Sequence, residues 1–324
     1  PGLTAPVIAG GKLFVAETDA HVVRALDAKS GEVLWEYVAG GRIDSPPTYY
    51  KGLLLFGSRD GWVHCLRAAD GSLSWRFRDL PDKLICAFDR LESAWPIHGS
   101  VLVKNGTAYF CAGRSSYLDG GIFVYGLNVV TGSLQHQRRL YGPYGEDGFP
   151  AFVEEGGRSE TEVILGNVAD VMSSVADTIY LRQQASQPDL TDGTPDKHLL
   201  ASSGMLESRR NHREYKLVKD NFNHRKVFTT LRADYPTGDI IVSDGTDYYS
   251  VFGHPVNRGE SWNPRGGYTL LAKTHTADGW IGKWQAKMPM TGKAMVLAGD
   301  AVFVVGAPLV FPSDDLAGTY AGRR

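Results

Sequence analysis

The sequence contains little cysteine, and this argues against a fold held together by disulfides. Its 324 residues include only three cysteines, Cys65, Cys86 and Cys111, which are too few for a disulfide scaffold but leave room for one bridge. Cys65 and Cys111 lie inside strand-like runs of the sequence. We therefore interpret these two thiols as small buried hydrophobic groups.

Long hydrophobic runs and an excess of charge are also absent. No stretch approaches the roughly 18 apolar residues that a membrane-spanning helix needs, so no membrane span is expected. The 34 basic and 36 acidic side chains give a net charge of -2, which predicts no attraction to nucleic acid or to anionic membranes. No signal peptide is visible, and the chain starts at Pro1, so we expect an N-terminus that was processed or cut from a longer protein.

Several catalytic motifs are missing as well. The sequence has no H-E-x-x-H, no C-x-x-C and no phosphate-binding loop. It also lacks G-x-S-x-G, which argues against a nucleophile elbow. Any chemistry would therefore depend on side chains that the fold brings together from distant segments.

The strongest positive signal is an internal repeat of 40 residues, seen when residues 5–37 are laid over 45–77. Identical residues recur in register, and apolar positions match between them. A period near 40 with short strands is typical of a propeller or array. The identical pairs are Pro6 and Pro46, Val23 and Val63, Leu26 and Leu66, Ala28 and Ala68, Gly31 and Gly71, and Trp35 and Trp75.

Each copy is interpreted as four antiparallel strands, which in the first copy are 5–10, 12–18, 21–27 and 32–38. The third copy carries a seven-residue insertion around Gly113–Gly120, between its second and third strands. The sequence thus predicts an all-β fold, a β-propeller of four-stranded antiparallel blades in one domain, with about five full blades and a partial one. The expected blades are 5–38, 45–78, 98–140, 162–220, 238–287 and the partial 293–324.

One segment of the repeat supports a family resemblance. Ala25–Trp35 (ALDAKSGEVLW) resembles the tryptophan-docking repeat of PQQ-like quinoprotein propellers, A-x-D-x-x-[ST]-G-x-x-x-W, and the second copy keeps D-G-x-x-x-W. The resemblance implies that Trp35 and Trp75 dock on the neighbouring blade, whereas His136 stands at the third tryptophan position. Gly113–Gly121 and Glu92–Ser100 also resemble bacterial PQQ-binding-like repeat proteins. PQQ itself is not expected, because dehydrogenases of this class carry an adjacent Cys-Cys pair that is absent here.

The resemblance also implies a larger ring and a compartment. Such propellers usually have seven or eight blades, so this chain is interpreted as a fragment, as an unusual closure, or as a ring whose open edge a second copy covers. An uncovered edge strand promotes association, so we expect a homodimer through that edge. The expected location is the periplasm or the extracellular space.

Strand parity predicts where a ligand would bind. In a four-stranded meander, the connection from strand four to the next blade and the loop between strands two and three lie on one face. That face should collect functional side chains at the mouth of the channel. The segments concerned are Gly40–Pro46, Ser58–Gly61, Arg90–His98, Arg114–Asp119 and His254–Arg265.

The residue types on this face suggest roles for the candidates. Arginines grip carboxylate, sulfate or phosphate, and Trp95 and Tyr117 can stack on a sugar or an aromatic ring. The catalytic candidates are His98, Asp44 and Glu92. The ligand-binding candidates are Arg42, Arg59, Trp95, Arg114, Tyr117, Asp119 and Arg209. The candidate ligands of a divalent metal, calcium or zinc, are Asp44, Glu92, His98, Asp170 and His212.

A structural interpretation stands beside these roles, because arginine–carboxylate pairs often only tie neighbouring blades together. The favoured function is a binding or scaffold module whose partner is a small molecule, a glycan or a protein. The alternative is a metal-assisted hydrolase of phosphate, sulfate or carboxyl esters. A PQQ-dependent oxidoreductase ranks third.

Overall fold

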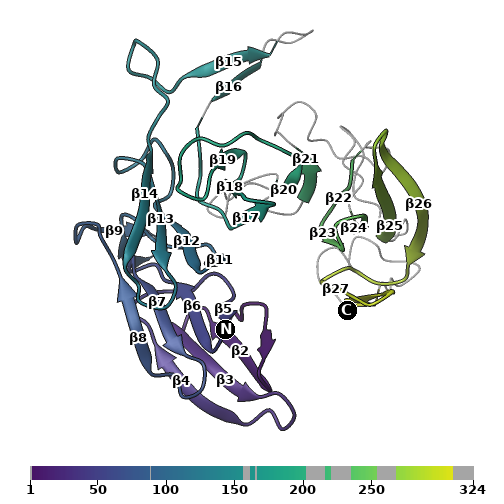
Figure 1. Cartoon of the computed structure of the whole chain (residues 1–324), viewed down its shortest axis with the longest axis horizontal. Coiled ribbons are helices and arrows are strands. Elements are labelled where there is room, and N and C mark those ends of the chain that lie inside the picture. The colour runs from purple at the N-terminus through teal and green to yellow at the C-terminus, as the bar shows by residue number, and fades with distance from the viewer. Residues whose placement is uncertain are drawn as a thin grey trace. The chain divides into compact units, whose positions relative to one another are not determined.

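A computed structural model describes residues 2–87, 89–155, 161–164, 166–201, 216–219, 235–253 and 268–308 of the chain. All regular secondary structure in these residues is β (Figure 1). The chain divides into two compact units, Pro1–Pro195 with Gly204–Leu206, and Asp196–Ser203 with Glu207–Arg324. Each is described by itself below. The described residues hold no helix with the length and apolarity that crossing a membrane requires.

Unit 1 begins with three four-stranded antiparallel sheets, in which each strand pairs with the next along the chain. These sheets are the blades predicted from the repeat class (Figure 1). Blade 1 comprises β1 (Val7–Ala9), β2 (Lys12–Glu17), β3 (Val22–Asp27) and β4 (Val33–Val38). Blade 2 comprises β5 (Thr48–Tyr50), β6 (Leu53–Gly57), β7 (Val63–Arg67) and β8 (Leu73–Phe77). Blade 3 comprises β11 (Leu102–Lys104), β12 (Thr107–Ala112), β13 (Ile122–Asn128) and β14 (Leu134–Leu140).

The local sequence explains the turn between the third and fourth strands of blades 1 and 3. In blade 1 the side chain of Asp27 accepts hydrogen bonds from the backbone N–H groups of Lys29 and Ser30. Gly31 then takes a φ of 77°, a conformation that favours glycine. In blade 3 the side chain of Asn128 accepts the equivalent bonds from the next turn. A short polar residue followed by glycine four positions later therefore sets this turn.

The tryptophan docking implied by the repeat is present. The indole Nε1 of Trp35 donates to the Ala68 carbonyl at 3.2 Å, and a Cβ placed on Gly71 would lie 2.6 Å from the Trp35 ring. The Trp35 indole therefore lies against a glycine of the following blade. Trp75 repeats the contact one blade later, because its Nε1 donates to the Val129 carbonyl at 3.1 Å and its ring lies against Gly132.

The contact changes at the third blade, where His136 occupies the tryptophan position opposite Gly126. Arg138, on the same strand, reaches the next sheet instead. Its guanidinium donates to the Leu190 carbonyl at 3.2 Å and pairs with Asp192 at 2.7 Å. An exposed ion pair of this kind contributes less stability than a docked indole.

The hydrophobic core of unit 1 lies between consecutive sheets. One cluster joins blades 1 and 2 around Phe14 and Phe56, and another joins blades 2 and 3 around Leu55 and Phe110. Cys65 and Cys111 are buried in these layers, as predicted, and all three cysteines are free thiols. No disulfide therefore forms.

The sequence predicted a single blade at 162–220, and the structure differs from this prediction. Its residues are divided between a three-stranded sheet in unit 1 and another in unit 2. After β19 the chain closes a tight turn, in which Gln187 N–H donates to the Thr191 carbonyl and Leu190 takes a φ of 67°. The strands concerned are β17 (Met172–Val175), β18 (Thr178–Leu181) and β19 (Gln184–Ser186), and then β20 (His198–Ala201), β21 (Lys216–Lys219) and β22 (Thr237–Gly238).

Unit 2 also contains a four-stranded sheet, followed by a pair of strands where the sixth repeat begins. Trp284 lies opposite Ala272 beside a β-bulge, as Trp35 lies opposite Ala25 beside the equivalent bulge of blade 1. Trp284 is 45% exposed. The sheet comprises β23 (Ile240–Ser243), β24 (Asp247–Phe252), β25 (Tyr268–Thr276) and β26 (Gly279–Met288), and the pair is β27 (Ala294–Ala298) with β28 (Ala301–Val305).

Two hairpins depart from the repeat. The segment expected to be a loop before blade 3 contains β9 (Leu84–Ala87) paired with β10 (Arg90–Ser93). A second pair, β15 (Phe152–Glu155) with β16 (Thr161–Ile164), follows blade 3. Both interrupt the 40-residue period, which explains why the repeat weakens after the second copy.

Candidate functional site

A polar cluster joins three of the segments that strand parity placed on one face. Asp44 lies between β4 and β5, and Arg59 lies in the turn after β6. Glu92 is on β10, and His98 precedes β11. Backbone hydrogen bonds fix these segments together, since Arg59 N–H donates to the Arg42 carbonyl and Ser93 N–H donates to the Arg59 carbonyl, each at 2.9 Å.

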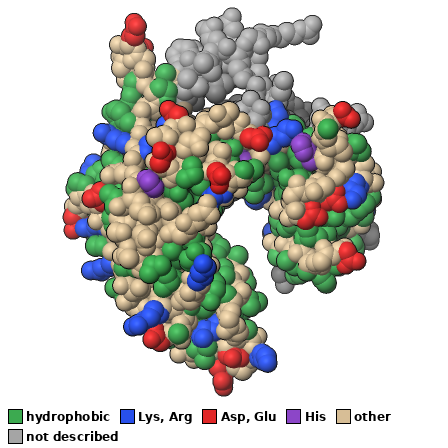
Figure 2. Space-filling view, viewed as in Figure 1, with side chains coloured by type: hydrophobic (Ala, Val, Ile, Leu, Met, Phe, Trp, Pro, Cys, Tyr) green, Lys and Arg blue, Asp and Glu red, His purple; other side chains and the backbone are tan. Residues whose placement is uncertain are grey.

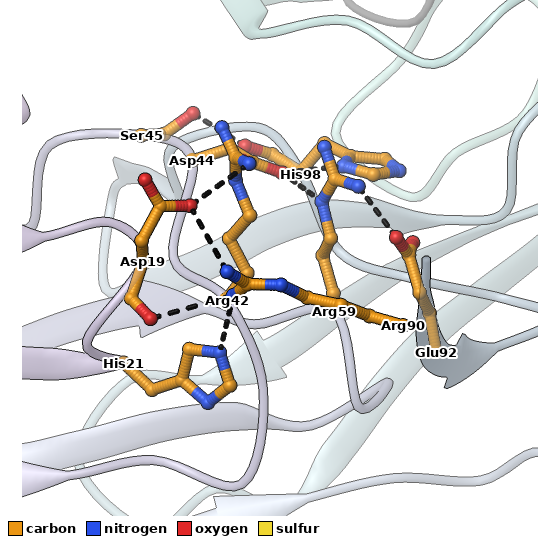
Figure 3. A network of polar contacts seen from close by, with 9 residues as sticks. All are labelled: Asp19, His21, Arg42, Asp44, Ser45, Arg59, Arg90, Glu92 and His98. Carbon is orange, nitrogen blue, oxygen red and sulfur yellow. Dashed lines mark hydrogen bonds and ion pairs between the residues drawn. The ribbon is translucent and has the colours of Figure 1, made fainter. Parts of the chain in front are cut away.

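Arg59 is the centre of this cluster. Its Nε donates to Asp44 Oδ2 at 2.6 Å, and its Nη1 donates to Glu92 Oε1 at 2.6 Å (Figure 3). The side chains are nearly buried, with exposed fractions of 11% for Arg59, 10% for Asp44 and 6% for Glu92. One guanidinium therefore pairs with two buried carboxylates, one from a loop and one from β10.

Asp44 collects two further donors. Arg42 Nε donates to its Oδ1, and His98 Nδ1 lies 2.8 Å from its Oδ2. Burial alone would raise the pKa of Asp44, but the hydrogen bonds from His98 and Arg59 outweigh it and hold the pKa well below its ordinary value. Asp44 is therefore a carboxylate throughout the physiological range.

His98 is fully buried, and this burial lowers the pKa of its imidazole below the ordinary value despite the adjacent carboxylate, which favours the neutral form. With its Nδ1–H donated to Asp44, its Nε2 carries a lone pair. This buried Nε2 has no hydrogen-bond partner among the described residues. A carboxylate-oriented imidazole with a free Nε2 can accept a hydrogen bond or a proton.

The cluster extends to residues that the sequence reasoning did not select. Arg42 pairs with Asp19 at 3.1 Å, and Arg90 reaches the same aspartate and His21 (Figure 3). The Ser45 hydroxyl donates to the His98 carbonyl. Asp19 lies in the turn between β2 and β3, so applying the parity rule to the first copy of the repeat would have found it.

The remaining predicted side chains form a second group around the insertion of blade 3. Asp119 accepts hydrogen bonds from Arg114 and, at 2.9 Å, from Lys83, while its carbonyl accepts the Trp95 Nε1–H at 3.0 Å. Tyr117 instead packs edge-on against Tyr144, with ring centroids 5.4 Å apart. The side-chain hydrogen bonds of Trp95, Arg114 and Asp119 are thus made within this second group rather than with Arg59.

Among the described residues, no group of three His, Cys, Asp or Glu side chains could hold a metal ion. The oxygens of Asp44 are occupied by arginine and histidine donors instead. Asp170 is buried and accepts the N–H of Val171 at 2.7 Å. Arg209, His212 and the segment 254–265 lie outside the described residues.

Comparison with known proteins gives one family match and several curated relatives. The family described as outer membrane protein assembly factor BamB matches residues 1–149, just under half of the chain. The BamB of Moranella endobia is 36% identical over 66 residues, which are 20% of this chain and 17% of that protein. The quinone alcohol dehydrogenase subunit of Gluconobacter oxydans is 32% identical over 122 residues, which are 33% of this chain and 16% of that protein. The matched segments thus span less than a fifth of these relatives.

Solved structures show more distant likeness. The crystal structure of BamB from Moraxella catarrhalis matches with a TM-score of 0.39 at 15% identity, over 94% of this chain and 66% of that one. The quinohemoprotein alcohol dehydrogenase ADHIIG of Pseudomonas putida HK5 matches with a TM-score of 0.46 at 11% identity, over 94% and 63%.

Proposed function

We propose that the chain is a protein-binding scaffold of the bacterial envelope. The premise is that residues 1–149 belong to the PQQ-like repeat family. The matching family and several curated relatives are named as outer membrane protein assembly factors. This supports a periplasmic location and a partner among proteins that handle outer-membrane proteins. The proposal concerns the chain as a binding module and assigns it no catalytic step.

The observation that carries this proposal is the set of contacts that joins the blades and loops of unit 1. Docked indoles lock consecutive blades, and the cluster around Arg59 ties the loops of blades 1 and 2 to the β9–β10 hairpin. The charged groups in this cluster form ion pairs with one another and are nearly buried. A platform whose loops are held in this way binds a protein surface with little ordering cost.

Affinity capture combined with cross-linking tests the scaffold. The purified chain is mixed with the periplasmic fraction of its source cells, cross-linked, and analysed by mass spectrometry and by size-exclusion chromatography with light scattering. The expected result is a protein partner in fixed stoichiometry, with cross-links to unit 1. A chain that captures no protein in fixed stoichiometry contradicts the scaffold proposal. The same light-scattering measurement shows whether the expected homodimer forms.

A second candidate is a small-ligand or hydrolase site at His98, favoured by the Asp44–His98 pair and the free Nε2. In this proposal the imidazole accepts a proton from a water or hydroxyl group, and Arg42 grips an anionic ester. A calcium or zinc ion held by Asp44, Glu92, His98, Asp170 and His212 would require Asp44 to release its arginine partners. PQQ chemistry is not proposed, because the adjacent cysteine pair is absent from the sequence.

Elemental analysis decides between the two candidates. The metal content of the purified chain is measured by mass spectrometry, and turnover of phosphate, sulfate and carboxyl esters is measured before and after chelation. Stoichiometric metal with chelator-sensitive turnover that is lost in His98→Gln would support the hydrolase. Absence of turnover both before and after chelation would contradict the hydrolase and leave the scaffold as the supported function.

A further inference from the structure

The segment 141–150, between β14 and β15, is a tight hairpin that projects from blade 3, and we call it the aromatic arm. Its backbone closes on itself, because Gly145 N–H donates to the Phe149 carbonyl at 2.8 Å and Gly148 N–H donates to the Gly145 carbonyl at 3.0 Å. Ala151 N–H also donates to the Pro143 carbonyl at 2.9 Å. The conformation of the arm is therefore set by its own hydrogen bonds.

The arm is also anchored to the insertion of blade 3. Gly142 N–H donates to the Ser116 carbonyl at 2.9 Å. The Tyr144 ring packs edge-on against Tyr117, and its hydroxyl donates to the Tyr117 carbonyl at 3.4 Å. A partner would thus meet a preformed surface, and binding would cost little conformational entropy.

The aromatic side chains of the arm are exposed rather than used for folding. Phe149 is 70% exposed, Tyr141 is 55% exposed and Tyr144 is 37% exposed. Burying a phenylalanine side chain stabilises a protein, and Phe149 leaves most of this stabilisation unrealised. In Figure 2 the protrusion at the upper left carries hydrophobic side chains beneath an acidic tip. Exposed apolar groups with a polar rim mark interaction sites.

The charges of the arm indicate the chemistry of its partner. Glu146 and Asp147 are both exposed at the turn of the hairpin. At the base of the arm, the guanidinium of Arg139 lies 4.6 Å from the centroid of the Tyr141 ring. This contact shows that an aromatic face of the arm holds a guanidinium. The turn supplies carboxylates for further cationic groups.

We propose that the aromatic arm is a docking site for an extended, cationic segment of a partner protein, rich in arginine and in apolar residues. Apolar side chains of that segment cover Phe149, and its guanidinium groups pair with Glu146 and Asp147. This inference rests on the proposed scaffold function and names the surface and the partner chemistry. The acidic turn disfavours an anionic membrane as the occupant.

Fluorescence anisotropy tests the arm directly on the full-length chain. The probe is a labelled 12-residue peptide of arginine, proline and leucine, compared with the same peptide carrying glutamate in place of arginine. The cationic peptide is expected to bind at least tenfold more tightly. Phe149→Ser and Glu146→Lys should each weaken its binding at least fivefold. Leu134→Ser is the matched control, since Leu134 is 44% exposed on β14 of the same blade and should leave binding unchanged.

The same variants are then used in the partner capture. Loss of the captured partner in Phe149→Ser and Glu146→Lys, but not in Leu134→Ser, supports the arm. If all three variants retain both partner and peptide, the arm proposal is overturned while the scaffold function stands. A chain-only dimer that dissociates in Phe149→Ser assigns the arm to a second copy and overturns the cationic partner. If the wild-type chain captures no protein, the scaffold function itself fails, whatever the peptide result.

Discussion

The contact between Trp35 and Gly71 offers a quantitative test of how the blades are joined. Replacing Gly71 with alanine forces a residue with a side chain into a φ of 74° and places its Cβ 2.6 Å from the indole. Gly31 occupies the same turn of blade 1, with a φ of 77° and nothing within 4 Å of an added Cβ. Gly31→Ala therefore reports the backbone strain alone.

The expected free energies follow from these two geometries. Gly31→Ala should lower the free energy of unfolding by about 1–2 kcal/mol, the cost of a left-handed conformation for a residue with a Cβ. Gly71→Ala should cost about 1–3 kcal/mol more, because the added methyl group overpacks the contact. Trp35→Ala should cost about 2–4 kcal/mol, somewhat below the value for a fully buried tryptophan, because Trp35 is half-buried.

The double variant separates docking from other causes. With Trp35 already removed, Gly71→Ala should cost only the backbone strain, so the two changes should be non-additive by about 1–3 kcal/mol. Urea unfolding followed by far-ultraviolet circular dichroism gives the four free energies. Costs that add to within about 0.5 kcal/mol, or a Gly31→Ala cost equal to that of Gly71→Ala, would refute the docking argument.

Three further predictions concern titration and reactivity. Burial raises the pKa of the Cys65 and Cys111 thiols to about 12, so iodoacetamide at pH 8 should modify only the exposed Cys86 in the native chain and all three after denaturation, as mass spectrometry would show. The lowered pKa of Asp44 implies stabilisation that is complete well above its ordinary value of 3.8 and is lost as the pH falls below it. Asp44→Asn should therefore cost about 3 kcal/mol at pH 7 and much less near pH 2, measured by urea unfolding. Burial lowers the pKa of His64 from 6.5 to about 4, so the unfolded state takes up a proton first. Between these pH values stability should fall by about 1.4 kcal/mol per unit of decreasing pH, and His64→Gln should flatten that slope.

The first three blades could be predicted because their turns depend on local chemistry. A polar residue followed by glycine, then tryptophan, recurs at Gly31 and Trp35 and again at Gly71 and Trp75. Such short-range patterns can be recognised in a single sequence. The two three-stranded sheets β17–β19 and β20–β22 could not be assigned in this way, because the turn after β19 uses Leu190 at positive φ in place of glycine and gives no recognisable signal.

The candidate site was predictable as a location but not as a set of contacts. Strand parity brought the segments of Asp44, Arg59 and Glu92 to one face, and the structure joins them. The pairing of each donor with a particular carboxylate depends on how far the side chains extend between blades, which the sequence pattern does not give. The sequence therefore suggested a shared metal ion, whereas the structure pairs the carboxylates of Asp44 and Glu92 with the guanidinium of Arg59. The β9–β10 hairpin, which positions Glu92, had no repeat to reveal it.

The direction of the tryptophan contacts has a consequence for the order of events during synthesis. Trp35 reaches forward 33 residues to Ala68, and Trp75 reaches forward 54 residues to Val129. A ribosome that adds about 5–20 residues per second would deliver the first acceptor roughly 2–7 s after its tryptophan, and the second after about 3–11 s. Blades 1 and 2 thus each emerge with an indole that is covered only after the following blade has been made. While blades 1 and 2 are being made, the nascent chain therefore presents one uncovered indole near its growing end, and a chaperone can bind it there.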